Sequence, residues 1–228
     1  MVNRTPVLQR GSSTRRAAPP FDNAAKRGID LVVSLLFLAA TVPLLAVLAL
    51  AVRLTSPGPV LFRQVRVGLG GRHFVVLKFR TMVSGADQRV HQDYVTHLLL
   101  DETPPDGGEA GVFKLVDDPR VTRVGRWLRQ SSLDELPQLI NVLTGSMSLV
   151  GPRPALPYEV ALFEPRHLSR HLVRPGITGL WQVSGRSALS MRDALDLDLQ
   201  YVQRHNSLLD LSILARTVPV VLMRSVAR

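Results

Sequence analysis

Two adjacent carboxylates stand in the stretch SSLDELPQ, residues 131–138, after two hydroxyl side chains and before an apolar run. In a structural interpretation, Ser132 and Glu135 form a capping box at the start of a helix, and Pro137 lies in its first turn. In a chemical interpretation, Asp134 and Glu135 stay ionised near the positive end of that helix, available as a nucleophile or as metal ligands. The two interpretations are compatible, and the octet alone does not separate them.

Basic residues elsewhere in the chain can complete a site for phosphate chemistry around this pair. A carboxylate that attacks phosphorus needs the negative charge of its target screened, and Mg²⁺ held by carboxylates and substrate phosphates is the usual device. Further screening is available from Lys78, Arg80, Arg129, Arg153, Arg174 and Arg186. Arg153 lies between Pro152 and Pro154, which either presents its planar fork to phosphate oxygens or forms a rigid surface turn.

A glycine-rich stretch, RPGITGLWQVSGR at residues 174–186, is another candidate binding segment. Arg174, Gln182 and Arg186 alternate there with glycines, where a backbone can approach a ligand closely. Taken alone, the stretch is equally compatible with an ordinary loop.

The composition narrows the class of partner. With 28 Lys and Arg against 18 Asp and Glu, the net charge of +10 favours polyanions such as anionic lipid headgroups or phosphorylated substrates. Nucleic acid is disfavoured, because the chain has no zinc-finger spacing, no RNP-like aromatic run and no clear helix-turn-helix. The absence of cysteine excludes disulfides and thiolate chemistry.

The most apolar segment of the chain, residues 31–52, contains 22 residues without a charge, enough to cross a bilayer core of ~30 Å. It is too long for a cleaved signal and is followed by Arg53, so we expect it to be retained. Six basic residues precede it and six follow it before the next acid, so the positive-inside rule gives no direction. Pro43, near its middle, kinks the helix, which allows either a kinked transmembrane helix or a re-entrant helix that returns to its own side.

The remaining segments are assigned from turn residues and apolar spacing. Residues 1–25 are expected to be a disordered basic tail near anionic lipid. Residues 55–82 are expected to form a β-hairpin that turns at residues 68–71. Residues 101–111 are expected to be a loop that is either a mobile cover or an exposed insertion. Arg123, Arg126 and Arg129 recur at helical spacing as a solvated face, with Trp127 and Leu128 expected on the opposite side. A helix over 136–143 ends at Gly145, a strand and rigid turn follow at 148–154, and the apolar C-terminal end is expected at the membrane interface.

Five motifs in this order resemble the bacterial sugar transferases, the monotopic polyprenyl-phosphate phosphoglycosyl transferases that begin surface-glycan assembly. They are KRGID before the apolar segment, KFRTM at 78–82, SSLDELPQL at 131–139, SLVGPRP at 148–154 and RPGITGLWQVSGR at 174–186. The resemblance extends from about Lys26 to the C-terminus and matches a compact form without extra N-terminal transmembrane helices.

The resemblance implies a reaction and roles for several residues. Asp134 attacks a phosphate of a UDP-sugar, UMP leaves, and polyprenyl (undecaprenyl) phosphate takes the sugar phosphate from the aspartyl intermediate. Glu135, with Asp134, holds Mg²⁺, and Arg153 contacts phosphate or the sugar nucleotide. The resemblance further implies substrate binding by Lys78, Arg129, Gln182, Arg186 and Asp198, and the charges of Arg80 and Arg174 add these two residues to the expected substrate-binding set. VFKLVDDPRVTRVGR at 112–126 is more similar to relatives that transfer glucose or galactose phosphate.

The resemblance also implies an architecture. The expected fold class is α+β and mainly helical. The protein is expected to be a monotopic membrane protein whose re-entrant membrane helix covers residues 26–53 and is broken at Pro43. Residues 54–228 are expected to form a cytosolic catalytic domain with a small hairpin or sheet and interfacial helices. Lys26 and Arg27 are expected to contact headgroups at the cytosolic face of the bacterial inner membrane. One departure is Val42 where relatives often carry Ser before the proline, so Thr41 is expected to support the bend instead.

Two alternatives from other classes stay open. A non-catalytic, membrane-anchored basic scaffold for glycan assembly explains the anchor and the charge but not the order of the motifs. A glycosyltransferase using the same donor releases UDP instead of UMP. The sequence leaves the donor sugar, the glycan pathway (exopolysaccharide, capsule or O-antigen) and a homo-oligomeric state undecided.

Overall fold

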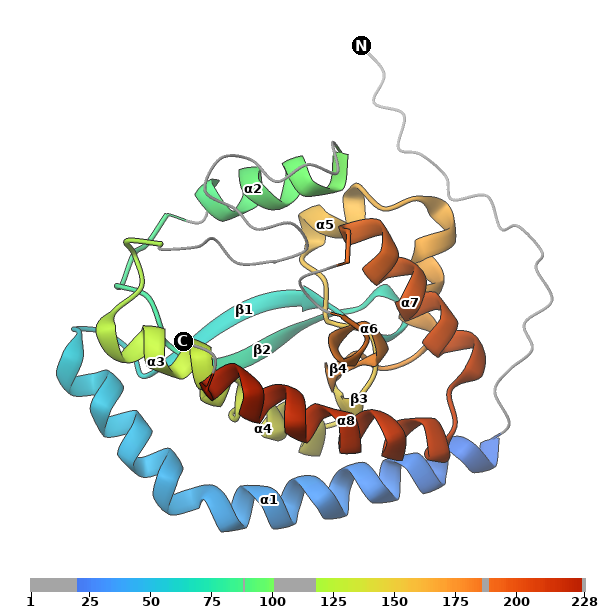
Figure 1. Ribbon diagram of the computed structural model, residues 1–228, viewed down its shortest axis with the longest axis horizontal. Coiled ribbons are helices and arrows are strands. Elements are labelled where there is room, and N and C mark those ends of the chain that lie inside the picture. Colours follow the sequence, from blue (N-terminus) through green and yellow to red (C-terminus); the bar gives the residue numbers. More distant parts are fainter. Residues whose placement is uncertain (1–19, 88, 101–117, 186–188, 227–228) are drawn as a thin grey trace.

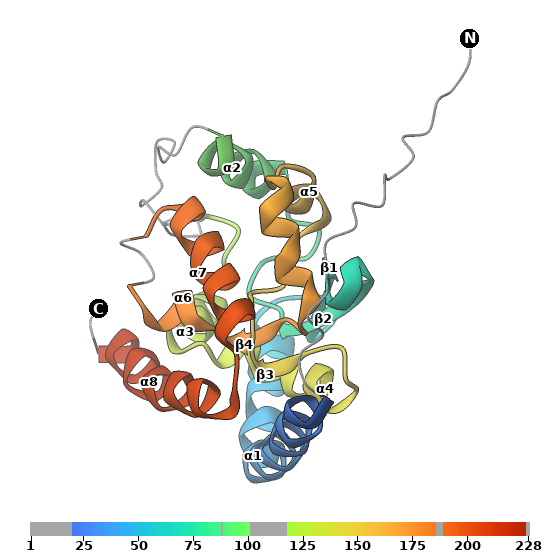
Figure 2. The ribbon, with the colours of Figure 1, turned by 90° about the vertical axis from the view of Figure 1, so that its right-hand side faces the viewer.

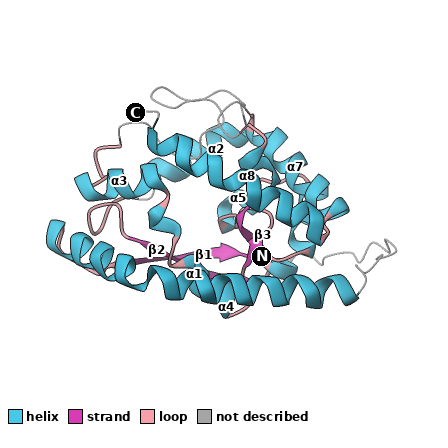
Figure 3. Cartoon of the chain, turned by 60° about the horizontal axis from the view of Figure 1, so that its bottom comes forward, coloured by secondary structure: helices cyan, strands magenta, loops and turns pink. Residues whose placement is uncertain are grey.

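The computed structural model describes residues 20–87, 89–100, 118–185 and 189–226 of the 228-residue chain (Figure 1). Its elements are α1 (Pro20–Thr55), β1 (Leu61–Val67), the 3₁₀ turn η1 (Leu69–Gly71), β2 (His73–Phe79), α2 (Arg89–Leu100), α3 (Arg123–Ser131), η2 (Leu133–Glu135), α4 (Gln138–Leu143), β3 (Ser148–Val150), α5 (Pro157–Ala161), η3 (Pro165–Leu172), β4 (Gly176–Thr178), α6 (Leu180–Val183), α7 (Met191–Arg204) and α8 (Ser207–Val226). The expected mainly helical fold with a small hairpin is confirmed, and helices dominate Figure 3.

Helix α1 lies along one side of the molecule, opposite α2, in both Figure 1 and Figure 2. It begins at Pro20, so its first residues fall within the expected tail; residues 1–19 and the expected loop 101–111 lie outside the described residues. From Ala24 to Thr55 the helix is long and apolar enough to cross a membrane, and most of its apolar surface is exposed. It contains Pro43 and changes direction part-way along its length (Figure 1).

The N-terminal half of α1 is attached to the domain by polar side chains. Lys26 Nζ lies 2.5 Å from Asp210 Oδ2 of α8 and 3.0 Å from a carbonyl of β3. Arg27 donates to the last two carbonyls of α4, at 2.7 and 3.1 Å, and buried Asp30 accepts from the backbone N–H of Leu149 at 3.1 Å. Lys26 and Arg27 thus help to attach α1 to the domain, and their expected contact with headgroups stays a prediction.

The C-terminal half of α1 is attached by apolar packing. Leu48 and Val52 are buried in a cluster with Phe79 of β2 and Leu128 of α3. Both halves of the helix therefore contact the same domain on either side of Pro43. Near the bend, Thr41 Oγ1 donates to Phe37 O at 2.7 Å, a back-bond that favours helix bending.

The hairpin pairs β1 with β2 in antiparallel register from Leu61 with Phe79 to Val67 with His73, as the Gly-rich turn predicts. The second edge of β2 is completed by a side chain. Buried Asn141 of α4 accepts from Leu77 N at 3.0 Å and donates to Val75 O at 2.7 Å, so its amide takes the place of a third strand.

Two of the sequence motifs meet in a small parallel sheet. Strand β3, from SLVGPRP, pairs with β4, from RPGITG, and Gly151 N continues the ladder to Thr178 O at 2.9 Å. A Cβ on Gly151 or on Gly176 would overlap the other segment's backbone, so only glycine allows this approach.

Three buried clusters hold these elements together. The largest joins β2, β3, α4, α7 and α8 through Val76, Leu139, Val142, Met147, Leu149, Val150, Tyr201 and Ile213. A second joins α1, β2 and α3, and a third packs α2 on α7. Trp127 was expected to be inward but is 51% exposed, because α3 packs against the domain through Val124, Gly125 and Leu128.

Candidate functional site

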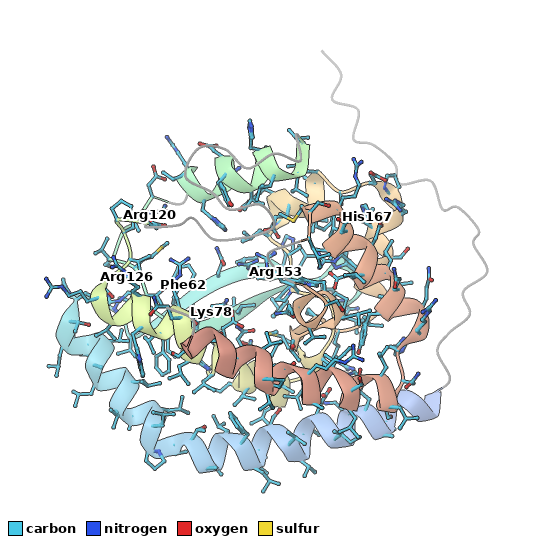
Figure 4. The ribbon with its side chains drawn as sticks, viewed as in Figure 1. Phe62, Lys78, Arg120, Arg126, Arg153 and His167 are labelled. Atoms are coloured by element: carbon cyan, nitrogen blue, oxygen red, sulfur yellow. The ribbon has the colours of Figure 1, made fainter. Side chains whose placement is uncertain are left out.

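A cavity of about 1620 Å³ lies between the hairpin, η2, α6 and the segment that links β3 to α5. Its wall includes most of the predicted site residues, namely Lys78, Arg80, Arg129, Asp134, Glu135, Arg153 and Gln182. Lys78 and Arg153 lie over the middle of the molecule in Figure 4, which also places Arg120 toward α2. Residues more than a hundred positions apart in the chain are thus brought to one wall.

Asp134 and Glu135 lie in η2, a single turn between α3 and α4. Leu133 and Leu136, which flank the pair, pack against the cluster that joins α1, β2 and α3. Asp134 borders the cavity but is only 4% exposed. Glu135 Oε1 accepts from Lys78 Nζ at 2.8 Å. The packing of the two leucines therefore holds an acidic pair against a cation at the cavity wall.

The predicted capping box is wrong. Ser132 adopts a left-handed conformation, with φ of 58°, and its side chain makes no capping bond. It lies between the end of α3 and the start of η2, where the motif predicted the start of a single helix, and α4 begins only at Gln138. Glu135 is used by Lys78 instead, while Gly145 follows α4 at φ of +86° as expected.

Arg153 borders the cavity, and its guanidinium forms an ion pair with buried Glu159. The Arg153 Nη1 atom lies 3.1 Å from Glu159 Oε2. Burial opposes the charge of Glu159, but the guanidiniums of Arg153 and Arg66 more than offset it and hold its pKa below the usual value. The turn between the two prolines is therefore an ordered, charged part of the cavity wall.

The other predicted cations divide between cavity and scaffold. Arg80 borders the cavity, but its guanidinium is buried and donates to carbonyls of Ser56 and Pro57, where it closes the turn after α1. Arg174 donates to Gly145 O at 3.0 Å and is not among the residues that line this cavity. Both residues have these structural contacts, and the expected substrate contact of each stays a prediction.

The last three predicted residues have different outcomes. Gln182 lies on the cavity wall and donates to Ile177 O at 3.2 Å. Asp198 lies behind the cavity, fully buried against Arg170, and burial raises its pKa to about 6. Arg186 lies outside the described residues.

Sequence reasoning missed several polar residues of the cavity wall. Arg66 lies on β1, where burial and the neighbouring Arg153 lower its pKa to about 10. Phe62, Gln64 and Arg66 alternate along the strand and therefore share one face of it, a pattern from which Arg66 could have been predicted to face the cavity. His91 of α2 has its pKa lowered to about 4 by burial and by Arg153. No sequence pattern identifies His91, because its contact with the cavity depends on how α2 docks.

Taken together, buried Asp134 beside the partly exposed Glu135, several guanidiniums and an exposed apolar helix define a membrane-associated site suited to an anionic, phosphorylated ligand. The sequence profile of the bacterial sugar transferase family matches residues 21–224, so the chain belongs to this family of enzymes.

Three relatives show the range of similar proteins. The undecaprenyl-phosphate glucose phosphotransferase of Komagataeibacter xylinus is 43% identical over 215 residues, which are 90% of this chain and 37% of that protein. The exopolysaccharide production protein ExoY of Sinorhizobium fredii is 39% identical over 205 residues, 90% of this chain and 88% of its own. The UDP-glucose:undecaprenyl-phosphate glucose-1-phosphate transferase of Caulobacter vibrioides is 43% identical over 205 residues, 86% and 69% of the two chains.

Proposed function

We propose that the protein transfers a sugar 1-phosphate from a UDP-sugar to undecaprenyl phosphate and releases UMP. The observation that carries this proposal is the position of Asp134, a buried carboxylate at a cavity wall shared with Lys78, Arg129 and Arg153. Such a wall compensates the charge of a diphosphate while it holds a nucleophile against it.

The reaction has two displacements at one phosphorus. An oxygen of Asp134 bonds to the phosphorus that carries the sugar, and the bond from that phosphorus to the UMP oxygen breaks. An oxygen of the lipid phosphate then bonds to the same phosphorus, and the bond to Asp134 breaks, which restores the carboxylate. Lys78 and Arg129 offset the charge that the phosphoryl oxygens carry in both steps, and Arg153 offsets the charge of the donor diphosphate.

The donor set of the cavity is compatible with Mg²⁺. Mg²⁺ binds through one or two carboxylates and takes its other ligands from water and substrate phosphates, and Asp134 and Glu135 are two adjacent carboxylates at the cavity. These residues would hold the ion, which supplies charge neutralisation to the phosphates.

The geometry of α1 supports a re-entrant, monotopic arrangement at the cytosolic face of the inner membrane. Both halves of the helix contact the same domain, through Lys26 and Arg27 at one end and through Leu48 and Val52 at the other. A straight spanning helix would carry its two ends to opposite sides of the bilayer, about 30 Å apart, and could not keep both sets of contacts.

The names of relatives support the donor and pathway. Those from K. xylinus and C. vibrioides are named for glucose transfer, and a relative in Erwinia amylovora is named a UDP-galactose-lipid carrier transferase. ExoY is named for exopolysaccharide production. We therefore propose UDP-glucose or UDP-galactose as donor and exopolysaccharide initiation as the role.

The test is nucleotide release by the full chain in detergent, with Mg²⁺, a panel of UDP-sugars, and undecaprenyl phosphate present or absent. UMP release that disappears with Asp134→Asn supports the proposal, and intact-mass analysis should detect the phosphosugar adduct on wild type only. UDP release would assign an ordinary glycosyltransferase, and no nucleotide from any donor would favour a scaffold.

A further inference from the structure

Two buried acids lie behind Arg153, and both act on it. The first, Glu159 of α5, is 1% exposed and accepts from both terminal nitrogens of Arg153, at 3.1 to 3.4 Å. Its Oε2 atom also accepts from Leu156 N at 2.7 Å, so the carboxylate is fixed by the first turn of α5. The plane of the Arg153 guanidinium is therefore set by a rigid partner.

The second acid, Asp198 of α7, reaches Arg153 through Arg170. The Arg170 Nη2 atom lies 2.5 Å from Asp198 Oδ2 and 2.7 Å from the backbone carbonyl of Arg153. The Arg170 guanidinium also lies over the ring of Phe163, 5.2 Å from its centroid. The hydrogen bond from Arg170 to the Arg153 carbonyl fixes the main chain of Arg153, while Glu159 fixes its side chain.

The buried Arg170–Asp198 pair is poorly suited to a purely stabilising role. Buried ion pairs are on average weak contributors to stability, because desolvation offsets their attraction. Within the described residues, Arg170 Nε and Asp198 Oδ1 are also buried without a hydrogen-bond partner. Neither residue lines the large cavity, whereas Arg153 does.

We propose that Glu159 and the Arg170–Asp198 pair are positioning residues that fix Arg153 on the cavity wall to bind a phosphate of the nucleoside diphosphate donor. The inference rests on the proposed function. Arg153 and Arg66 both interact with Glu159, so the three groups together leave one net positive charge at the wall. Asp198 thus acts on the substrate indirectly, through Arg170.

The test is steady-state UMP release by the full chain, with donor and undecaprenyl phosphate varied separately. Glu159→Gln keeps an acceptor for Leu156 N but removes the charge, so we expect the donor KM to rise about tenfold. The acceptor KM should change less than twofold. Asp198→Asn should also raise the donor KM. Glu164 is an exposed acid paired with Arg166, so Glu164→Gln is the matched control, for which we expect wild-type kinetics.

A double-mutant cycle separates positioning from general damage. If Glu159 acts through Arg153, adding Glu159→Gln to Arg153→Lys should leave the donor KM within twofold of Arg153→Lys alone. Additive effects, or a donor KM within twofold of wild type in folded Glu159→Gln and Asp198→Asn, would overturn the inference. Should Glu159→Gln not fold, Asp198→Asn and Arg170→Lys decide by the same criterion, whereas a wild-type protein that releases no UMP would overturn the proposed function itself.

Discussion

The Nζ atom of Lys78 lies 2.8 Å from Oε1 of Glu135, so the hairpin and the turn η2 meet in an ion pair beside Asp134. Both side chains are about a quarter exposed. This pair links the KFRTM motif to the DE motif, which the sequence separates widely.

Removing the Lys78 cation should reduce turnover without unfolding the protein. For Lys78→Met we expect UMP release to fall about 10- to 100-fold, because the phosphoryl oxygens and Glu135 lose a charge partner. Lys78→Arg should retain part of the activity. Arg126→Met removes an exposed cation from α3 and should behave as wild type; equal losses in both variants would point to net charge instead of this pair.

Glu135→Gln should change the response to metal. We expect the Mg²⁺ concentration for half-maximal UMP release to rise about tenfold, since the amide is a poor ligand for a hard cation. A Mg²⁺ titration of wild type and variant measures this shift. An unchanged midpoint would remove Glu135 from the set of metal ligands.

Pro43→Ala should straighten α1. The chain has no cysteine, so a single thiol at exposed Ala24 or Thr55 reports its own side of the membrane. In the native helix we expect both thiols to be labelled from the cytosol. With Pro43→Ala, the thiol at residue 24 should become accessible from the periplasm; continued cytosolic labelling would show that the contacts of Lys26 and Leu48 hold the bend without the proline.

Gly151→Ala should destabilise the protein. The added Cβ would overlap the backbone of Arg174 and Gly176, and overpacking of this kind costs about 1–3 kcal/mol. Gly28→Ala is the control, because Gly28 is exposed on α1 with nothing near its Cβ position. Melting temperatures in detergent should fall only for Gly151→Ala.

Stability should fall on mild acidification because of His91. Its pKa is lowered to about 4 by burial and by Arg153, so between about pH 6.5 and pH 4 the unfolded chain binds a proton that the folded chain does not. The stabilisation by neutral His91 is therefore present above pH 6.5 and lost as the pH falls toward 4, an effect on the order of 3 kcal/mol. His91→Gln should flatten the melting temperature against pH in this window; parallel curves would contradict it.

Local patterns determined much of the architecture. Alternating residues around a glycine turn specified the hairpin, 3.6-residue spacing specified α4, and an uncharged apolar run specified α1, because each depends on near neighbours in the chain. The order of the motifs likewise singled out Asp134 and Glu135, which the structure places at the cavity wall.

Only the tertiary structure decided how the many cations are used. Lys26, Arg27, Arg80 and Arg174 all bind protein acceptors, because long side chains reach carbonyls that the fold brings near from distant segments. The left-handed conformation of Ser132 could not be predicted, since a Ser followed three residues later by Glu is the ordinary pattern of a capping box. The sequence thus determined which residues can do chemistry, and long-range packing decided which of them face the cavity and which hold it together.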